Sequence, residues 1–296
     1  MHKYLFIFGT KLELYSILNV FSFFPLLIFN LCHCRQKKEN LSALSERVLA
    51  ACQKNLRINT RFRFLKSKLF WTMIETVILS CLQFFPLLIL TSVFASAFNT
   101  GSNYFGYLYV IPFILHIVYW LIGLDPFKQS NLTTPAFALS LLVAKLACFC
   151  SGCCRGIEST VFGMYNHTSQ RTEVPVQLIE AAWAVLLFVF CMLWRKKEKP
   201  GTLLPLYTIL YSATRFCSEF LRNEADIIGP LKKYHIFCLV GIAFGVIQYV
   251  IVSRCGEQLR TFIANGLPAI ISNRKTKKKK NKKKKNKKKN NIKTKK

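Results

Sequence analysis

Residues 132–153 read LTTPAFALSLLVAKLACFCSGC, an apolar run with one cation, Lys145, and an end rich in thiols. A helix needs about 20 mostly apolar residues to cross a bilayer core, so this run is long enough. An ionisable side chain inside such a segment is costly, which makes Lys145 a candidate functional residue. At 1.5 Å per residue it lies roughly 10 Å before Gly152, so an interfacial lysine that extends to the membrane surface is the alternative.

Apolar runs of similar length recur along the chain, and 52% of all residues are hydrophobic. We therefore predict an all-α polytopic membrane protein with about seven transmembrane helices. The predicted spans cover residues 12–32, 69–97, 104–123, 132–153, 176–194, 202–221 and 235–253. The first run begins with charged residues and lacks a small-residue exit, so we expect it to stay in the mature chain.

Lysine and arginine are unevenly distributed among the connections between the predicted spans. Residues 32–68 hold ten of them and residues 195–201 hold four, whereas residues 155–173 hold two and residues 222–233 hold three. Positively charged loops stay on the cytoplasmic side of a membrane. We therefore expect the N-terminus outside and the C-terminus in the cytoplasm.

The chain divides into two parts by composition, a membrane domain over residues 1–260 and a lysine-rich tail over residues 261–296. The tail contributes much of the formal net charge of +29. A segment with so few apolar residues cannot form a core, so we expect a disordered cytoplasmic tail that is attracted to anionic membrane lipid. Nucleic-acid binding is not predicted, because the chain has no folded basic domain.

The chain has twelve cysteines, and most of them lie in apolar runs where they act as small hydrophobic residues. Cys148, Cys150, Cys153 and Cys154 are different because they cluster at the end of one span. Packing, a disulfide or zinc binding could explain the cluster. Zinc is the least favoured, since a second pair of ligands is missing from the sequence, and we predict no metal or cofactor.

The run over residues 202–221 carries a regular polar pattern. Tyr211, Arg215 and Glu219 recur every fourth residue, with Arg222 one turn further, so they share one face of a helix. This face must contact protein or water rather than lipid. A structural ion pair between Arg215 and Glu219 is one explanation. The other is phosphate binding, for which a guanidinium is well shaped.

Several separated stretches are similar to one family, the prolipoprotein diacylglyceryl transferases. The resemblance covers most of residues 4–253 and rests on Tyr15, Phe105-Gly106, the stretch 132–156, the motif PVQLIE over residues 175–180, and the polar face from Tyr211 to Arg222. It implies transfer of a diacylglyceryl group from phosphatidylglycerol to the lipobox cysteine of prolipoproteins. The implied location is the bacterial cell membrane, with several spans, and the implied partners are phosphatidylglycerol, prolipoprotein signal peptides and membrane lipid.

The resemblance also implies roles for particular residues. We expect catalytic roles for Arg215, Lys145, Glu219 and Tyr211, with the two cations on the phosphate. We expect substrate binding by Tyr15, Gly152, Gln177, Glu180 and Arg222.

Some positions depart from the family pattern. Lys145 stands where arginine is usual, and the usual histidine near Phe105 is absent. The proton acceptor therefore stays open between the phosphate, His116 and a glutamate. The alternative functions are a catalytically weak paralogue that binds phospholipid or lipoprotein, and a small-solute transporter.

Overall fold

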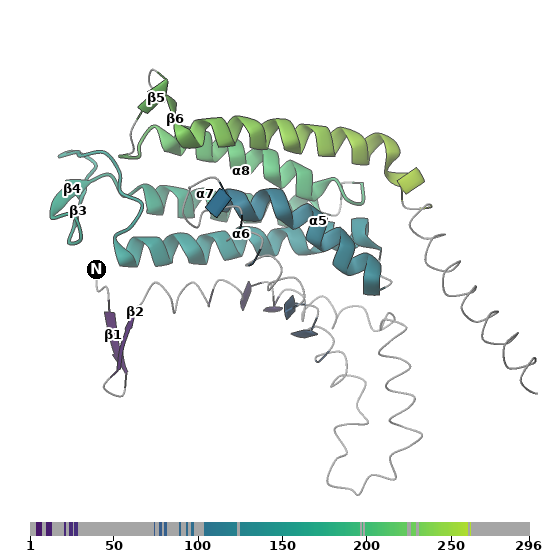
Figure 1. The fold of residues 1–296 in the computed structure, drawn as a ribbon, viewed down its shortest axis with the longest axis horizontal. Coiled ribbons are helices and arrows are strands. Elements are labelled where there is room, and N and C mark those ends of the chain that lie inside the picture. The colour runs from purple at the N-terminus through teal and green to yellow at the C-terminus, as the bar shows by residue number, and fades with distance from the viewer. Residues whose placement is uncertain are drawn as a thin grey trace, which may run out of the picture. The chain divides into compact units, whose positions relative to one another are not determined.

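The computed structural model describes most of the chain from residue 104 to residue 261 (Figure 1). The described residues are 4–7, 10–13, 104–122, 125–195, 197, 199–223, 226–228, 231–259 and 261, with scattered positions between 21 and 97. The chain divides into two units, Met1–Ser253 and Arg254–Lys296.

The described part of the chain is mostly helical. Its helices are α5 (Tyr104–Ile122), α6 (Pro126–Ser151), α7 (Val176–Trp194), α8 (Leu203–Glu219) and a C-terminal helix, Lys233–Leu259. Of these, α6, α7 and the C-terminal helix are long and apolar enough to cross a membrane, and α5 contains a shorter apolar helix, Phe105–Trp120. The predicted spans 12–32 and 69–97 lie largely outside the described residues, so the number of seven stays a prediction.

Helix α6 begins at Pro126, earlier than the predicted start at residue 132. The Asp125 carboxylate caps this end and accepts hydrogen bonds from the backbone N–H groups of Phe127 at 3.2 Å and Lys128 at 3.4 Å. A proline at the first helical position fits this geometry, because its missing N–H would have no partner there. The helix ends at Gly152, whose φ of 70° is the left-handed conformation that favours glycine.

The described residues also include three short antiparallel hairpins, which the sequence did not predict and which leave the protein mostly helical, as predicted. They are β1 (Tyr4–Ile7) with β2 (Thr10–Glu13), β3 (Met164–Asn166) with β4 (Arg171–Glu173), and β5 (Asp226–Ile228) with β6 (Leu231–Lys232). The predicted start of the first span at residue 12 is wrong, since Leu12 pairs with Leu5 in a strand. Charged and apolar residues alternate over residues 11–13, which is the period of a strand rather than of a helix.

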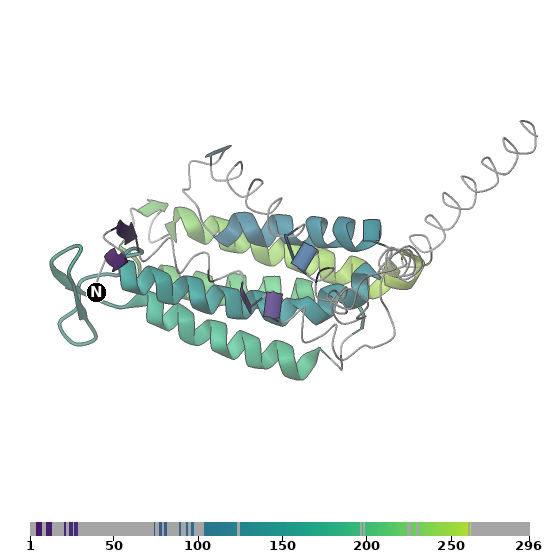
Figure 2. The ribbon, with the colours of Figure 1, turned by 90° about the horizontal axis from the view of Figure 1, so that it is seen from below.

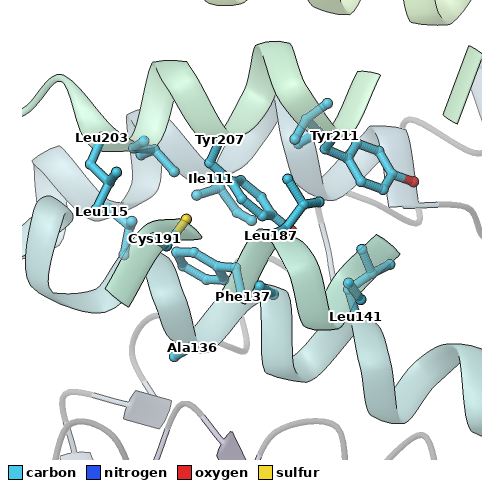
Figure 3. Packing of buried hydrophobic residues seen from close by; sticks show 14 of the residues in the cluster. Ile111, Leu115, Ala136, Phe137, Leu141, Leu187, Cys191, Leu203, Tyr207 and Tyr211 are labelled. Atoms are coloured by element: carbon cyan, nitrogen blue, oxygen red, sulfur yellow. The ribbon is translucent and has the colours of Figure 1, made fainter. Parts of the chain in front are cut away.

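The core lies among α5, α6, α7 and α8 (Figure 3). Leu115, Phe137, Leu187 and Tyr207 contribute to it, one from each helix, and all four are buried. Helices α6 and α7 lie side by side in both views (Figures 1 and 2). Lipid tails are as apolar as these side chains, so close packing holds membrane helices together more than transfer out of water does.

Asn131 links α6 to the connection before α8, and its replacement tests this link. Its Oδ1 accepts hydrogen bonds from the backbone N–H groups of Gly201 and Leu203, both at 3.0 Å, and its Nδ2 donates to the Lys199 carbonyl at 2.9 Å. Asn131→Ala leaves two buried N–H groups without this acceptor, so we expect a loss of about 1–3 kcal/mol in stability. Thermal unfolding in detergent measures it. Lys128→Ala, an exposed change in the same helix, is the control and should leave the midpoint unchanged; equal midpoints for both variants would contradict the prediction.

Candidate functional site

Glu180 is the centre of a buried ion cluster. It lies on the second turn of α7 and is 5% exposed. Its Oε2 is 2.7 Å from Lys145 Nζ on α6, and its Oε1 pairs with Arg215 on α8. Arg222 Nη2 donates to both oxygens at 3.0 and 3.2 Å, and Ser218 Oγ donates to Oε1 at 3.0 Å. Three cations from separate parts of the chain therefore meet at one carboxylate.

Glu219 supplies a second carboxylate to the cluster. Its side chain is fully buried, and its Oε2 is 2.7 Å from Arg215 Nη2 and 3.8 Å from Arg222 Nε. The first of these is the ion pair that the four-residue spacing on α8 suggested. Arg215 is thus held between two carboxylates, which fixes the position of its guanidinium.

The cluster carries an excess of positive charge. Among the residues that the structure describes, the carboxylates paired with Lys145, Arg215 and Arg222 are those of Glu180 and Glu219, three cations against two carboxylates. A further buried cation lies next to them. Lys232 Nζ donates to the backbone carbonyls of Glu219, at 3.1 Å, and of Arg222. Buried charge is expensive unless it is compensated, so this site favours an anionic ligand.

Lys232 is a residue that sequence reasoning missed. It lies in β6, in the connection after α8, and it is 7% exposed. In the sequence it looked like one of a few cations in a loop. Only its burial against the end of α8 distinguishes it from an ordinary surface lysine.

Arg222 reaches the cluster by a route that differs from the predicted one. Helix α8 ends at Glu219, so Arg222 does not continue the helical face of Tyr211 and Arg215. It follows a turn and forms an isolated β-bridge with Gly156. Burial by itself lowers the pKa of Arg222, but the nearby groups, Glu180 first and then Cys154 and Glu219, together outweigh burial and raise it. Arg222 therefore remains a permanent cation beside Glu180.

A small pocket opens beside the cluster. Its polar lining comes from the side chains of Lys145, Glu180, Tyr211, Thr214, Arg215 and Ser218. Its apolar lining comes from Leu141, Trp183 and Leu187. A ligand bound here would meet both charged and apolar side chains, which suits an amphipathic ligand with an anionic head.

Tyr211 connects the pocket with the hydrophobic core. Its ring packs edge-on against Phe105 with the centroids 6.0 Å apart, and it stacks on Tyr207 at 6.3 Å (Figure 3). The ring of Tyr234, in the C-terminal helix, lies near Arg215, with its centroid 5.8 Å from the guanidinium carbon. An aromatic face near a buried guanidinium stabilises its charge.

Gly152 and Gln177 shape the connection between α6 and α7. A Cβ atom on Gly152 would lie 2.5 Å from Thr168 Oγ1, so only glycine fits there. Gln177 donates from Nε2 to the Cys153 carbonyl, which ties the start of α7 to the end of α6. Asn166, which the sequence reasoning did not assign to the site, donates to the Gly152 carbonyl at 3.2 Å. These contacts hold the connection between α6 and α7 in place, next to the cluster rather than inside it.

Two further candidates remain, Tyr15 and His116. Tyr15 lies outside the described residues. The Nδ1 atom of His116 is 2.6 Å from the Pro112 carbonyl of its own helix, and its ring packs edge-on against Phe127. His116 does not line the pocket described above. These contacts favour a packing role for His116 over proton relay.

Three of the four clustered cysteines come together in space. The Sγ atoms of Cys148, Cys153 and Cys154 all lie within 4.8 Å of one another, and all three side chains are partly buried. Cys150 does not join them, and the cysteines in the described part of the chain are all free thiols. Contacts with the sulfur atoms of Cys148 and Cys153, and then the charge of Arg222, lower the pKa of Cys154 from its ordinary value.

Comparison with known proteins gives one consistent family. The model of the family "prolipoprotein diacylglyceryl transferase" matches residues 4–251. A phosphatidylglycerol–prolipoprotein diacylglyceryl transferase of Clostridium tetani is 32% identical over 134 residues, which is 42% of this chain and 53% of that protein. A protein of the same name from Clostridioides difficile is 35% identical over 81 residues, which is 27% of this chain and 33% of that protein. Another from Thermosynechococcus vestitus is 41% identical over 75 residues, which is 24% of this chain and 28% of that protein. The matched stretches thus span about a third to a half of these relatives. Since the family match extends over most of the chain, this protein belongs to the prolipoprotein diacylglyceryl transferase family.

Proposed function

We propose that this protein transfers a diacylglyceryl group from phosphatidylglycerol to the thiol of the lipobox cysteine in prolipoproteins. The observation that carries the proposal is the buried, net-positive cluster around Glu180 beside a small pocket lined by charged and apolar side chains. A phospholipid has an anionic head group that can pair with the cations and an apolar part that can contact the apolar side chains of the pocket. The relatives named above bear the name of this activity.

The main requirement of this reaction is stabilisation of the negative charge that develops on the phosphate oxygen. The sulfur of the acceptor attacks the glycerol carbon that carries the phosphate ester, and a C–S bond forms as the C–O bond breaks. The bonding electrons leave with glycerol phosphate. Fixed cations around the phosphate stabilise the charge that develops on its oxygen, and groups already in place do this without reorganising. Arg215 and Lys145, which both line the pocket, are suited to this role.

The other residues of the cluster hold these cations in position. Glu180 and Glu219 each form an ion pair with the guanidinium of Arg215 and so fix its position. Arg222 forms a further ion pair with Glu180 and offsets its negative charge. Tyr211 lines the pocket and can donate a hydrogen bond to the glycerol. In this proposal Gln177 and Gly152 act through the connection that they order, and Tyr15 contributes to substrate binding.

The membrane arrangement is part of the proposal. We propose a multi-pass protein of the bacterial cell membrane with seven spans, an outside N-terminus and a cytoplasmic tail over residues 261–296. The uneven distribution of lysine and arginine supports this orientation. In it, the end of α6 and the start of α7 lie toward the outer face, where prolipoprotein signal peptides expose the lipobox.

A transfer assay tests the proposed function. Purified protein in vesicles that contain phosphatidylglycerol is mixed with a lipobox peptide, and the peptide mass is measured. We expect a gain of one diacylglyceryl group on the cysteine peptide and none on the matching serine peptide. We also expect growth of a transferase-depleted bacterium that carries this gene. A peptide of unchanged mass, with protein that still binds phosphatidylglycerol, would instead indicate a binding protein without transfer.

Lys145→Arg is expected to raise the transfer rate several-fold. A guanidinium can donate two parallel hydrogen bonds to a phosphate, whereas an ammonium acts as a point charge. Lys145→Met, of similar length without charge, should lower the rate by about tenfold or more, because hydrogen bonds to charged groups contribute about 1.5–3 kcal/mol. Initial rates of the peptide assay measure both. If the arginine variant is slower than the parent at equal thermal stability, Lys145 does not bind the phosphate.

A further inference from the structure

The thiols of Cys148, Cys153 and Cys154, hereafter the thiol triad, have no role in the mechanism above. Cys148 lies in the last turn of α6, and the other two follow Gly152. The left-handed turn at Gly152 folds the chain back, so that the Cys153 N–H donates to the Cys148 carbonyl at 3.2 Å. This turn brings together thiols that a continued helix would separate.

The dimensions of the thiol triad suit one metal ion. The Sγ atoms of Cys153 and Cys154 are 3.9 Å apart, and the largest separation within the triad is below 4.8 Å. Thiolates bound to tetrahedral zinc at about 2.3 Å lie about 3.8 Å from one another. Small rotamer changes therefore suffice to bind zinc, and three ligands leave the fourth position open.

The surroundings match the charge of such a centre. Three thiolates with Zn²⁺ carry one net negative charge. Lys145 is one turn from Cys148 on α6, and Arg222 forms a β-bridge with Gly156, two residues after Cys154. The cluster around Glu180 has a positive excess that a zinc–thiolate centre would offset. No carboxylate belongs to the thiol triad, so it selects zinc over magnesium or calcium.

We propose that Cys148, Cys153 and Cys154 bind one zinc ion, whose fourth position takes the thiol of the acceptor protein. The choice of this ligand rests on the proposed function. Glu180 and Glu219 are both paired with cations and are poor proton acceptors, yet the acceptor cysteine must react as a thiolate. Coordination to a metal deprotonates a thiol. Arg222 connects the thiol triad with Glu180, because its side chain contacts both Cys154 and Glu180.

The step balances without another reactant. The acceptor thiol binds zinc and releases its proton to water. Its sulfur then forms the C–S bond with the glycerol carbon, and the C–O electrons leave on glycerol phosphate. The thioether product is a neutral, weaker ligand, and a second acceptor thiol replaces it.

Metal analysis of the full-length protein tests the site without any transfer. We expect about one zinc per chain in protein purified with a phosphine reductant, and at least a fivefold lower content in Cys148→Ser, Cys153→Ser and Cys154→Ser. Cys150→Ser is the matched control, since Cys150 lies on the same segment outside the triad and should keep its zinc. Thermal unfolding of each variant shows whether the chain still folds. A folded parent without zinc, or with a Cys153–Cys154 disulfide and two hydrogens fewer by mass, overturns the proposal, as does equal zinc in all variants.

Cobalt substitution tests the fourth ligand. Addition of a lipobox peptide to the Co²⁺ protein should change the visible bands of the metal, and the serine peptide should not. Identical spectra with both peptides overturn the assignment of the acceptor thiol. Zinc-free protein that still transfers lipid at the full rate overturns this inference and leaves the proposed function intact. Zinc-loaded protein that responds to the cysteine peptide but transfers nothing supports the site and rejects the proposed function.

Discussion

Glu180→Gln is expected to lower the stability of the protein by about 3–5 kcal/mol, because it removes the charge that three buried cations share. Glutamine has the same shape, so packing on α7 is retained and the loss reports on charge. The Arg215, Arg222 and Lys145 side chains would then repel one another at close range. Thermal unfolding in detergent, read by loss of helical circular dichroism, measures the effect.

The matched control for this prediction is Glu158→Gln. Glu158 also pairs with an arginine, Arg171, but both side chains are more than half exposed. Exposed ion pairs contribute about 0–1 kcal/mol, so this change should be nearly neutral. Equal shifts for the two variants would mean that the buried cluster is not held together by the charge of Glu180.

Arg215→Ala is expected to lower the transfer rate by about 100-fold or more, in line with the loss of one preorganised group at a developing charge. Arg215 lines the pocket, is 7% exposed, and is fixed by carboxylates on two sides. Arg215→Lys keeps the charge and loses the second hydrogen bond, so its rate should fall between those of the parent and the alanine variant. Rates are measured with the lipobox peptide at saturating phosphatidylglycerol.

Two measurements separate catalysis from folding in this series. The midpoint of thermal unfolding shows whether the alanine variant is folded at the assay temperature. Arg171→Ala removes an exposed arginine from the connection between α6 and α7 and should keep the full rate. Full activity in folded Arg215→Ala would show that another cation binds the phosphate.

The ion pair between Arg215 and Glu219 could be predicted from the sequence. Arg215 and Glu219 are one turn apart on a helix, so their ion pair follows from spacing alone. The spacing of Gln177 and Glu180 likewise placed both at the start of one helix, α7. Periodicity is reliable where neighbours in the chain are also neighbours in space, which is the case within a helix.

The errors fell where the chain leaves regular structure. The polar face on α8 was expected to include Arg222, yet the helix ends at Glu219 and Arg222 follows a turn. Lys232 was missed because nothing local distinguishes a buried lysine from an exposed one. The prediction of no metal rested on ligand spacing along the chain and stays a prediction; such spacing does not describe the fold around Gly152 that brings the thiol triad together.

The sequence by itself determined that the described chain is a mostly helical membrane protein, because apolar runs in lipid must satisfy their backbone hydrogen bonds internally. It also determined that α8 carries an arginine and a glutamate on one face. Only the tertiary structure decided that Glu180 is the meeting point of Lys145, Arg215 and Arg222. The physical reason is that a buried carboxylate is stabilised by cations wherever they come from, so its partners depend on how helices and connections pack rather than on their order in the chain.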